Sequence, residues 1–85
     1  MRLPIIKHVL GFIEANDEDW VHETIELLES MVEIPSLKDG ELEVMAELLS
    51  NLYGTLEVQS MIKQGIEKKV ALNTFMERVK SSIDK

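Results

Sequence analysis

His22 is the residue of this chain whose neighbours come closest to a reactive arrangement. Glu18 precedes it by four residues and Glu26 follows it by four, so a helix would place all three side chains on one face. One imidazole between two carboxylates can hold a divalent metal weakly. A weak metal-dependent or accessory enzyme built around His22 is therefore one alternative for the function.

Two metal-binding patterns begin at this place, and both are incomplete. The run 22–26, HETIE, is similar to the zinc motif of metalloproteases but has a glutamate where the second histidine belongs. Asp19 and His22 have the spacing of half a di-iron carboxylate site, and the chain has no second such pair. We therefore expect a solvated helix face here, with no metal ligands and no cofactor.

No other group of residues suggests a catalytic centre. The chain has no cysteine, which excludes thiol nucleophiles, thiolate metal sites and disulfides. Its four glycines are too scattered for a phosphate-binding loop. The serines fall on expected helix surfaces, caps or the tail, without an oriented base nearby. The sequence therefore predicts no catalytic residue, and we expect a protein that is not an enzyme.

Charge is distributed unevenly along the chain. Residues 1–60 hold 13 acids and 3 bases, whereas residues 61–85 hold 3 acids and 6 bases, within a net charge of −7. Between His8 and Leu37 there are eight acids and neither Lys nor Arg. An acidic surface repels phosphate, so we expect no nucleic-acid partner. An acidic mimic that occupies a DNA-binding protein is a further alternative.

Apolar residues recur at helical spacing in four segments, which predicts helices at about residues 4–15, 18–32, 36–64 and 68–83. No segment shows the alternation of a strand. The short connections favour antiparallel neighbours. We expect an all-α fold, namely one compact four-helix domain over residues 1–85 with the long third helix at its centre.

The third segment carries two apolar stripes about 100° apart, which is typical of a helix with neighbours on two sides. The main stripe consists of Leu42, Met45, Leu49, Leu52, Tyr53 and Leu56. The second stripe, a candidate self-association surface, consists of Val44, Leu48, Thr55, Val58 and Ile62. Gly54 in mid-helix costs about 1 kcal/mol relative to alanine, and close approach of another helix would explain it.

The second segment divides into an apolar and an acidic face, and its acidic face is the candidate docking surface for a basic partner. Trp20 begins the apolar face beside these acids. We expect its ring to be buried in the core, although tryptophan is also common at interfaces. The candidate protein-binding residues are Glu18, Asp19, Trp20, His22, Glu23, Glu26 and Glu29.

No apolar run is long enough to span a membrane, and the first eight residues do not form a signal peptide. A cysteine-free chain of this kind is expected in the cytoplasm. We expect its partner to be another protein or a second copy of itself, as a possible homodimer, and neither a nucleic acid nor a membrane.

Three stretches, FIEANDEDWVHETIELLES (12–30), SLKDGELEVMAELLSNLYGTLEV (36–58) and ALNTFMERV (71–79), together resemble a family of small bacterial all-helical proteins of unknown function. The resemblance covers nearly the whole chain. It implies a compact bacterial cytoplasmic protein and carries no activity to any residue. The leading hypothesis is therefore a non-catalytic protein–protein interaction or regulatory module.

Overall fold

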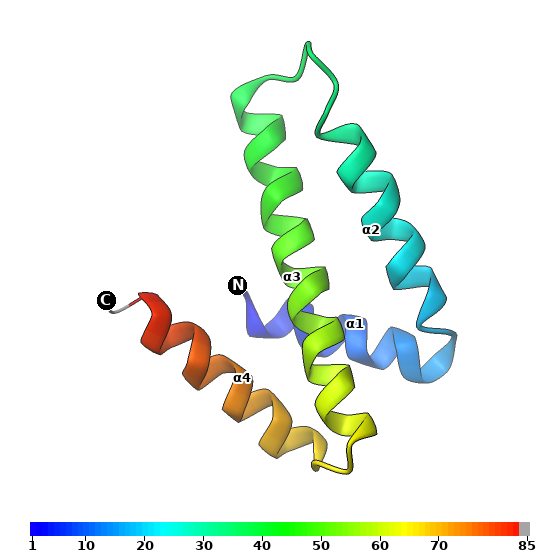
Figure 1. Ribbon diagram of the computed structural model, residues 1–85, viewed down its shortest axis with the longest axis vertical. Helices are drawn as coiled ribbons and strands as arrows, with labels where there is room; N and C mark the ends of the chain where they lie inside the picture. The colour runs from blue at the N-terminus through cyan, green and yellow to red at the C-terminus, as the bar shows by residue number, and fades with distance from the viewer. Residues whose placement is uncertain (84–85) are drawn as a thin grey trace.

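The computed structural model describes residues 1–83, and four helices make up most of this part of the chain (Figure 1). They are α1 (Leu3–Ala15), α2 (Asp19–Met31), α3 (Asp39–Lys63) and α4 (Lys68–Ile83). No strand occurs within residues 1–83. The helix α3 is the longest and packs against the other three. The prediction of an all-α fold with a long central third helix is confirmed.

The starts of α2 and α3 are set by acidic side chains. Asp17 Oδ1 accepts a hydrogen bond from the backbone N–H of Asp19 at 3.0 Å, as expected of a residue before a helix. Glu41 Oε1 accepts one from the backbone N–H of Lys38 at 3.0 Å. The helix α3 therefore begins at Asp39, three residues later than the sequence pattern predicts.

Gly65 allows the chain to turn at the end of α3. Gly65 has φ +100°, a backbone conformation that glycine adopts without strain. The next residue, Ile66, donates its backbone N–H to the carbonyl of Met61 at 3.1 Å, which closes the last turn. The chain then reverses direction and enters α4.

The buried core consists of two clusters, one against each apolar stripe of α3. The first joins α1, α3 and α4 through Ile6, Leu10, Val58, Ala71, Leu72 and Phe75. The second joins α1 and α2 through Ile13, Val21 and Ile25, against which Leu49, Leu52 and Leu56 of α3 pack. The two apolar stripes of α3 thus have neighbours on two sides, as predicted.

Two residues in the middle of α3 allow α1 and α4 to approach closely. Asn51 is fully buried, and its Oδ1 accepts the backbone N–H of Arg2 at 2.8 Å, which fixes the start of α1. A Cβ at Gly54 would lie 2.9 Å from Phe75 Cζ and 2.8 Å from Met1 Sδ. The helix continues through Gly54, and close approach of α4 explains the glycine, as predicted.

The far ends of α2 and α3 extend away from the rest of the molecule (Figure 1). We define the arm as residues 26–50, which comprise the second half of α2, the connection and the first half of α3. No residue of the arm is buried. The molecule measures 43 × 36 × 18 Å, and it is thin because α1 and α4 cover only the other half of the α2–α3 pair.

Candidate functional site

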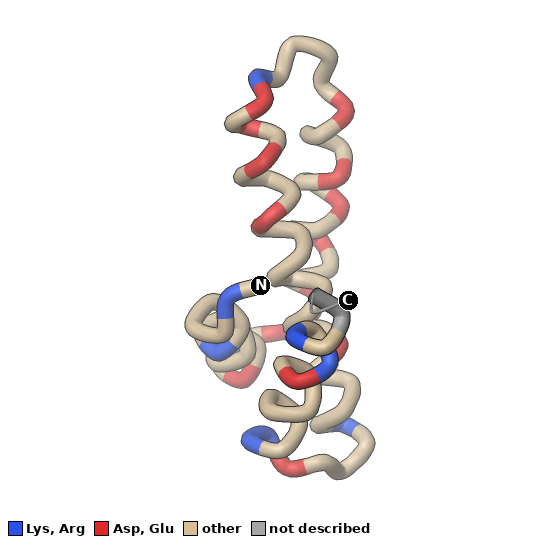
Figure 2. The backbone as a smooth tube through the Cα atoms, turned by 90° about the vertical axis from the view of Figure 1, so that its left-hand side faces the viewer, with Lys and Arg blue, Asp and Glu red and all other residues tan. Residues whose placement is uncertain are grey.

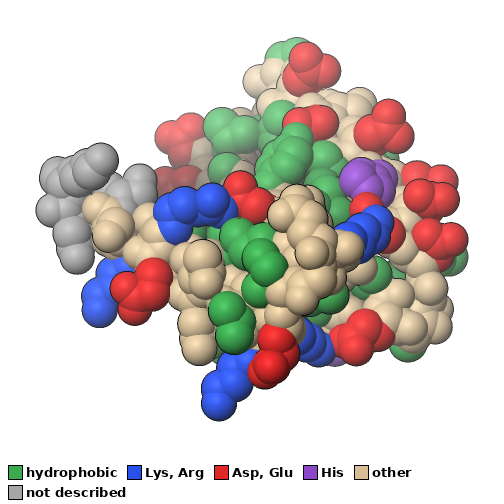
Figure 3. All heavy atoms as spheres, turned by 60° about the horizontal axis from the view of Figure 1, so that its bottom comes forward, with side chains coloured by type: hydrophobic (Ala, Val, Ile, Leu, Met, Phe, Trp, Pro, Cys, Tyr) green, Lys and Arg blue, Asp and Glu red, His purple; other side chains and the backbone are tan. Residues whose placement is uncertain are grey.

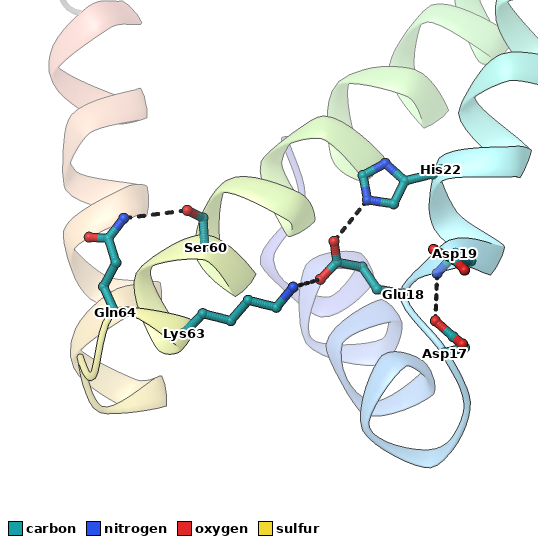
Figure 4. Close-up of polar contacts among 7 residues, drawn as sticks. All are labelled: Asp17, Glu18, Asp19, His22, Ser60, Lys63 and Gln64. Atoms are coloured by element: carbon teal, nitrogen blue, oxygen red, sulfur yellow. Dashed lines mark hydrogen bonds and ion pairs between the residues drawn. The ribbon is translucent and has the colours of Figure 1, made fainter.

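Glu18 and His22 form an ionic cluster with Lys63 rather than an open site (Figure 4). Glu18 lies just before α2, and its Oε2 is 2.8 Å from His22 Nε2. Its Oε1 is 2.7 Å from Lys63 Nζ, at the end of α3. That oxygen is enclosed and has no other polar partner among the described residues, so Lys63 supplies its counter-charge. The cluster ties the start of α2 to the end of α3.

This cluster changes the pKa of Glu18. The hydrogen bond from Lys63, followed by that from His22, lowers the pKa of the Glu18 carboxyl below its usual value. Partial burial opposes the shift but does not reverse it. Glu18 is therefore held as a carboxylate and acts as a structural anchor.

His22 and its carboxylates do not assemble as a metal site would require. His22 contacts Glu18, while Glu26 makes no ion pair with it in the structure. Within residues 1–83, no three His, Cys, Asp or Glu side chains converge closely enough to hold a metal ion. Lys63 Nζ lies 2.7 Å from Glu18 Oε1, which places a positive charge at this carboxylate.

The remaining acids of α2 form an exposed ridge. We define the acidic ridge as Asp19, Glu23, Glu26 and Glu29, which lie on the side of α2 away from α3 or at its border. Glu29 accepts a hydrogen bond from the Tyr53 hydroxyl. Asp19, Glu23 and Glu26 make no ion pair with any other described residue, so their charge is open to solvent.

Within residues 1–83, the bases lie mainly away from these acids. Figure 2 shows Asp and Glu along both helices of the arm, whereas most Lys and Arg lie near α1 and α4. Figure 3, with the bottom of Figure 1 forward, shows several Asp and Glu along the right-hand edge, further acids elsewhere, and Lys and Arg spread over this face. Lys68 pairs with Glu14 at 2.6 Å, and Arg78 pairs with Glu57. The arm itself holds seven acids and one base, Lys38.

Trp20 does not lie in the core, so the prediction of burial is wrong. Its side chain is 57% exposed, and its ring packs edge to face with that of Phe12, with centroids 6.4 Å apart. The side of α2 that faces the core carries Val21 and Ile25, and Trp20 lies at the border of this buried side. Beside the two rings is a hollow of about 240 Å³, lined also by Thr24 and Leu52.

Five large apolar residues are exposed on the arm, namely Leu27, Ile34, Leu42, Val44 and Leu48. Leu27 is 61% exposed, Val44 60% and Leu48 40%. The second stripe of α3 is therefore divided: Val44 and Leu48 remain open, whereas Thr55 and Val58 are fully buried. Only the first half of that stripe can serve as an interaction surface, as the second half is covered within the chain.

These exposed residues share one face of the molecule. Trp20, Thr24 and Leu27 have the spacing that places side chains on one side of α2. Val44, Leu48 and Leu52 do the same on α3. The hollow brings Leu52 together with Trp20 and Thr24, so the two sides adjoin. We define the arm face as Phe12, Trp20, Leu27, Val44 and Leu48.

Phe12 and Leu27 are the members of the arm face that sequence reasoning missed, because both fit the apolar stripe of their helix. Helix length is the signal that points to such exposure. At 1.5 Å per residue the 25 residues of α3 extend over about 38 Å, and α1 and α4, with 13 and 16 residues, can each cover only part of that length. Periodicity identifies an apolar side, but it does not say how much of that side is covered.

A larger hollow of about 510 Å³ lies between the start of α1 and α4, at Met1, Leu3, Met76 and Val79. None of its lining residues belongs to the acidic ridge or to the arm face. None of the helices within residues 1–83 is both long enough and apolar enough to cross a lipid bilayer. The fold and the site together define an all-helical protein with a structural ion cluster and an exposed apolar face beside an acidic ridge.

The chain belongs to a family of unknown function, DUF6952, whose sequence profile matches residues 1–84. The resemblance seen in the sequence is thereby confirmed as membership of an uncharacterised family. No curated protein and no solved structure shows a significant match. The family assignment brings no activity with it, so the function must be argued from the arm face and the acidic ridge.

Proposed function

We propose that this protein is a non-catalytic protein–protein interaction module whose docking surface is the arm. The observation that supports this best is the exposure of the five large apolar side chains of the arm face, between 40% and 61%, on α1, at the start of α2 and on the arm. Exposed apolar patches rimmed by polar residues are typical of protein interaction sites. The acidic ridge lies directly beside this face.

The charge of the arm favours a basic partner. Seven acids and one base give the arm a net charge of −6. Such a surface attracts a basic protein at long range and raises the rate of encounter, while the apolar side chains supply most of the binding energy once water is excluded. The proposal has this module act in the cytoplasm, in keeping with its cysteine-free chain.

The two alternatives receive less support. An enzyme around His22 would need a base that is aimed at a substrate and oriented by another group, whereas His22 Nε2 is directed at Glu18, which is itself paired with Lys63. An acidic mimic of nucleic acid would need a continuous charged surface, whereas Leu27, Val44 and Leu48 lie open on the arm. The paired state of Glu18 disfavours the enzyme, and the exposed apolar side chains favour a protein surface as the partner.

A capture experiment with matched charge variants tests the proposal. The ridge variant Glu23→Gln/Glu26→Gln removes two acids of α2 that make no ion pair with a described residue. The control variant Glu67→Gln/Glu77→Gln removes two exposed acids from the α4 end. We expect proteins that are captured by the natural sequence and by the control to be lost, or held only at lower salt, with the ridge variant. Capture of the same proteins by all three chains would contradict the proposal.

A further inference from the structure

We infer that the arm face binds an amphipathic helix of its partner, with an apolar stripe between two rows of Lys or Arg. This inference rests on the proposed function and specifies the partner. It is carried by three features of the structure: the spacing of the apolar residues, the position of the acids around them, and the hollow at one end.

The apolar residues have the arrangement of a surface on which a helix packs. Val44, Leu48 and Leu52 recur every four residues along α3, and they cover about 12 Å of its length. On α2, Trp20 and Leu27 are seven residues apart, which is about 10 Å. We define the trough as the strip of surface between these two rows, along which a third helix can lay its own apolar row.

The end of this trough is closed by α1. Phe12 and Trp20 meet edge to face at the corner between α1 and α2, beside the hollow of about 240 Å³. One large side chain of a docked helix would fit this hollow, against the two rings. The corner therefore fixes where the docked helix ends, whereas the opposite end of the trough, at the tip of the arm, is open.

The acids determine what kind of helix fits. Glu23 is three residues from Trp20 and four from Leu27, so it borders both on the surface of α2. Glu41 and Glu47 are each three residues from Val44 and border it on α3; Glu47 also lies 3.7 Å from the N-terminal amine of Met1, so Glu41 is the acid of this pair without an ion-pair partner among the described residues. Carboxylates thus line both sides of the apolar row. A helix with Lys or Arg on both sides of its stripe would place opposite charges along both edges.

A second copy of this chain is a poorer occupant. Arm against arm would bring together two surfaces of net charge −6 each. The bases of α4 cannot replace a basic amphipathic helix, because the apolar side of α4, with Ala71, Leu72 and Phe75, is buried in the core. Charge therefore favours a different, basic chain over self-association.

Trp20 allows the inference to be tested directly, because it is the only tryptophan of the chain and is 57% exposed. The probe is a synthetic amphipathic helix of about four turns with leucines at i, i+3, i+4 and i+7 and lysines on both sides. We expect its addition to shift the emission of Trp20 to shorter wavelength, with saturation. A peptide of the same composition in scrambled order, and one with glutamates in place of lysines, should leave the emission unchanged.

Matched variants distinguish specific binding in the trough from non-specific binding to any exposed apolar residue. Leu27→Gln and Val44→Gln remove exposed apolar side chains without changing charge, and Val70→Gln does the same on the outer side of α4, where Val70 is 51% exposed. We expect each arm variant to weaken peptide binding about tenfold, as for anchors of an interface. Val70→Gln should leave the affinity unchanged, and circular dichroism shows that each variant is folded.

Three outcomes would overturn the inference. One is the absence of an emission shift with the amphipathic peptide, and another is an equal shift with the scrambled peptide. The third is a shift of Trp20 that depends on protein concentration alone, which would identify a second copy as the occupant. If any of these occurs while protein capture still depends on Glu23 and Glu26, the proposal of an interaction module is retained and only the proposal of a helical partner is rejected.

Discussion

Phe12 and Trp20 pack edge to face across the corner of α1 and α2, with ring planes at 87° and centroids 6.4 Å apart. Both rings remain open to solvent, at 41% and 57% exposure. An aromatic pair of this geometry is oriented by the attraction between one ring's edge and the other's face. The pair therefore holds the indole in a fixed orientation on an open surface, which is what a preformed docking site requires.

Removal of Phe12 should release the indole. Phe12→Ala is expected to reduce the near-ultraviolet circular dichroism of Trp20 and to lower the free energy of unfolding by about 1 kcal/mol. The control, Val70→Ala, removes an exposed apolar side chain of α4 and should leave the tryptophan signal unchanged. An unaltered Trp20 signal in Phe12→Ala would show that the contact does not orient the ring.

The ion pair between Glu18 and Lys63 predicts a particular dependence of stability on pH. Because folding lowers the pKa of Glu18 from its usual 4.5, the ionised form is favoured in the folded state. The stabilisation is present above the unfolded-state value and is lost as pH falls through the lowered, folded-state value. We expect Lys63→Gln to lower the free energy of unfolding by up to about 1 kcal/mol at neutral pH, and by less in acid.

Chemical denaturation at neutral pH and at a pH below the folded-state value of Glu18 checks this. Lys69→Gln removes an exposed base that makes no ion pair with a described residue, and it should have little effect at either pH. An equal loss for Lys63→Gln at both pH values would mean that Lys63 stabilises the fold through something other than the Glu18 carboxylate.

The hydrogen bond from Tyr53 to Glu29 predicts an opposite pH dependence. This bond, with a smaller effect of desolvation, raises the pKa of the phenol above its usual 10. The neutral phenol is the donor, so the contact stabilises the fold below pH 10 and is lost as pH rises through the raised value. Because Tyr53 is the only tyrosine, ultraviolet absorbance follows its ionisation alone.

Glu29→Gln should bring the pKa of Tyr53 back toward 10, because it removes both the charge and the strong acceptor. The neighbouring acid Glu33 serves as a control, since Glu33→Gln removes a charge from the arm without touching this bond. If both variants gave the same titration curve as the natural sequence, the bond would not persist in solution.

Two glycine substitutions should change stability in opposite directions. In Gly54→Ala the new methyl group would lie 2.9 Å from the ring of Phe75, which is buried and cannot withdraw freely. We expect a loss of about 1–3 kcal/mol in the free energy of unfolding, despite the better helix propensity of alanine. In Gly11→Ala no atom lies within 4 Å, so a gain of up to about 1 kcal/mol is expected. Thermal unfolding of the two variants measures both effects, and a loss of the same size at both positions would contradict the close approach of α4 at Gly54.

Much of the fold follows from sequence periodicity, because each helix carries a row of apolar residues that must be covered. The central position of α3 and the close approach at Gly54 were both predictable from the pattern within one helix. The start of α3 was not predictable in this way. Ser36 and Asp39 also fit a capping pattern, but in the structure the capping hydrogen bond runs from the backbone N–H of Lys38 to Glu41.

The candidate site was predictable only in part, because coverage depends on how the helices cross. Val44 and Val58 belong to the same stripe of α3, yet Val44 is 60% exposed and Val58 is buried. Nothing in the local sequence distinguishes them, since the difference arises from where α1 and α4 lie. The ion-pair partner of Glu18 also could not be predicted from the sequence, because Lys63 is 45 residues away and lies beside Glu18 only in the folded chain.

Site-specific photo-cross-linking in living cells tests the central claim, that the arm is a docking surface for another protein, most directly. A photoreactive amino acid is placed at Leu27 on the arm face and, in a separate chain, at Val70 on α4; the two positions are 61% and 51% exposed. We predict that a basic protein is cross-linked at Leu27 and not at Val70. No adduct at Leu27, or the same adducts at both positions, would contradict the account.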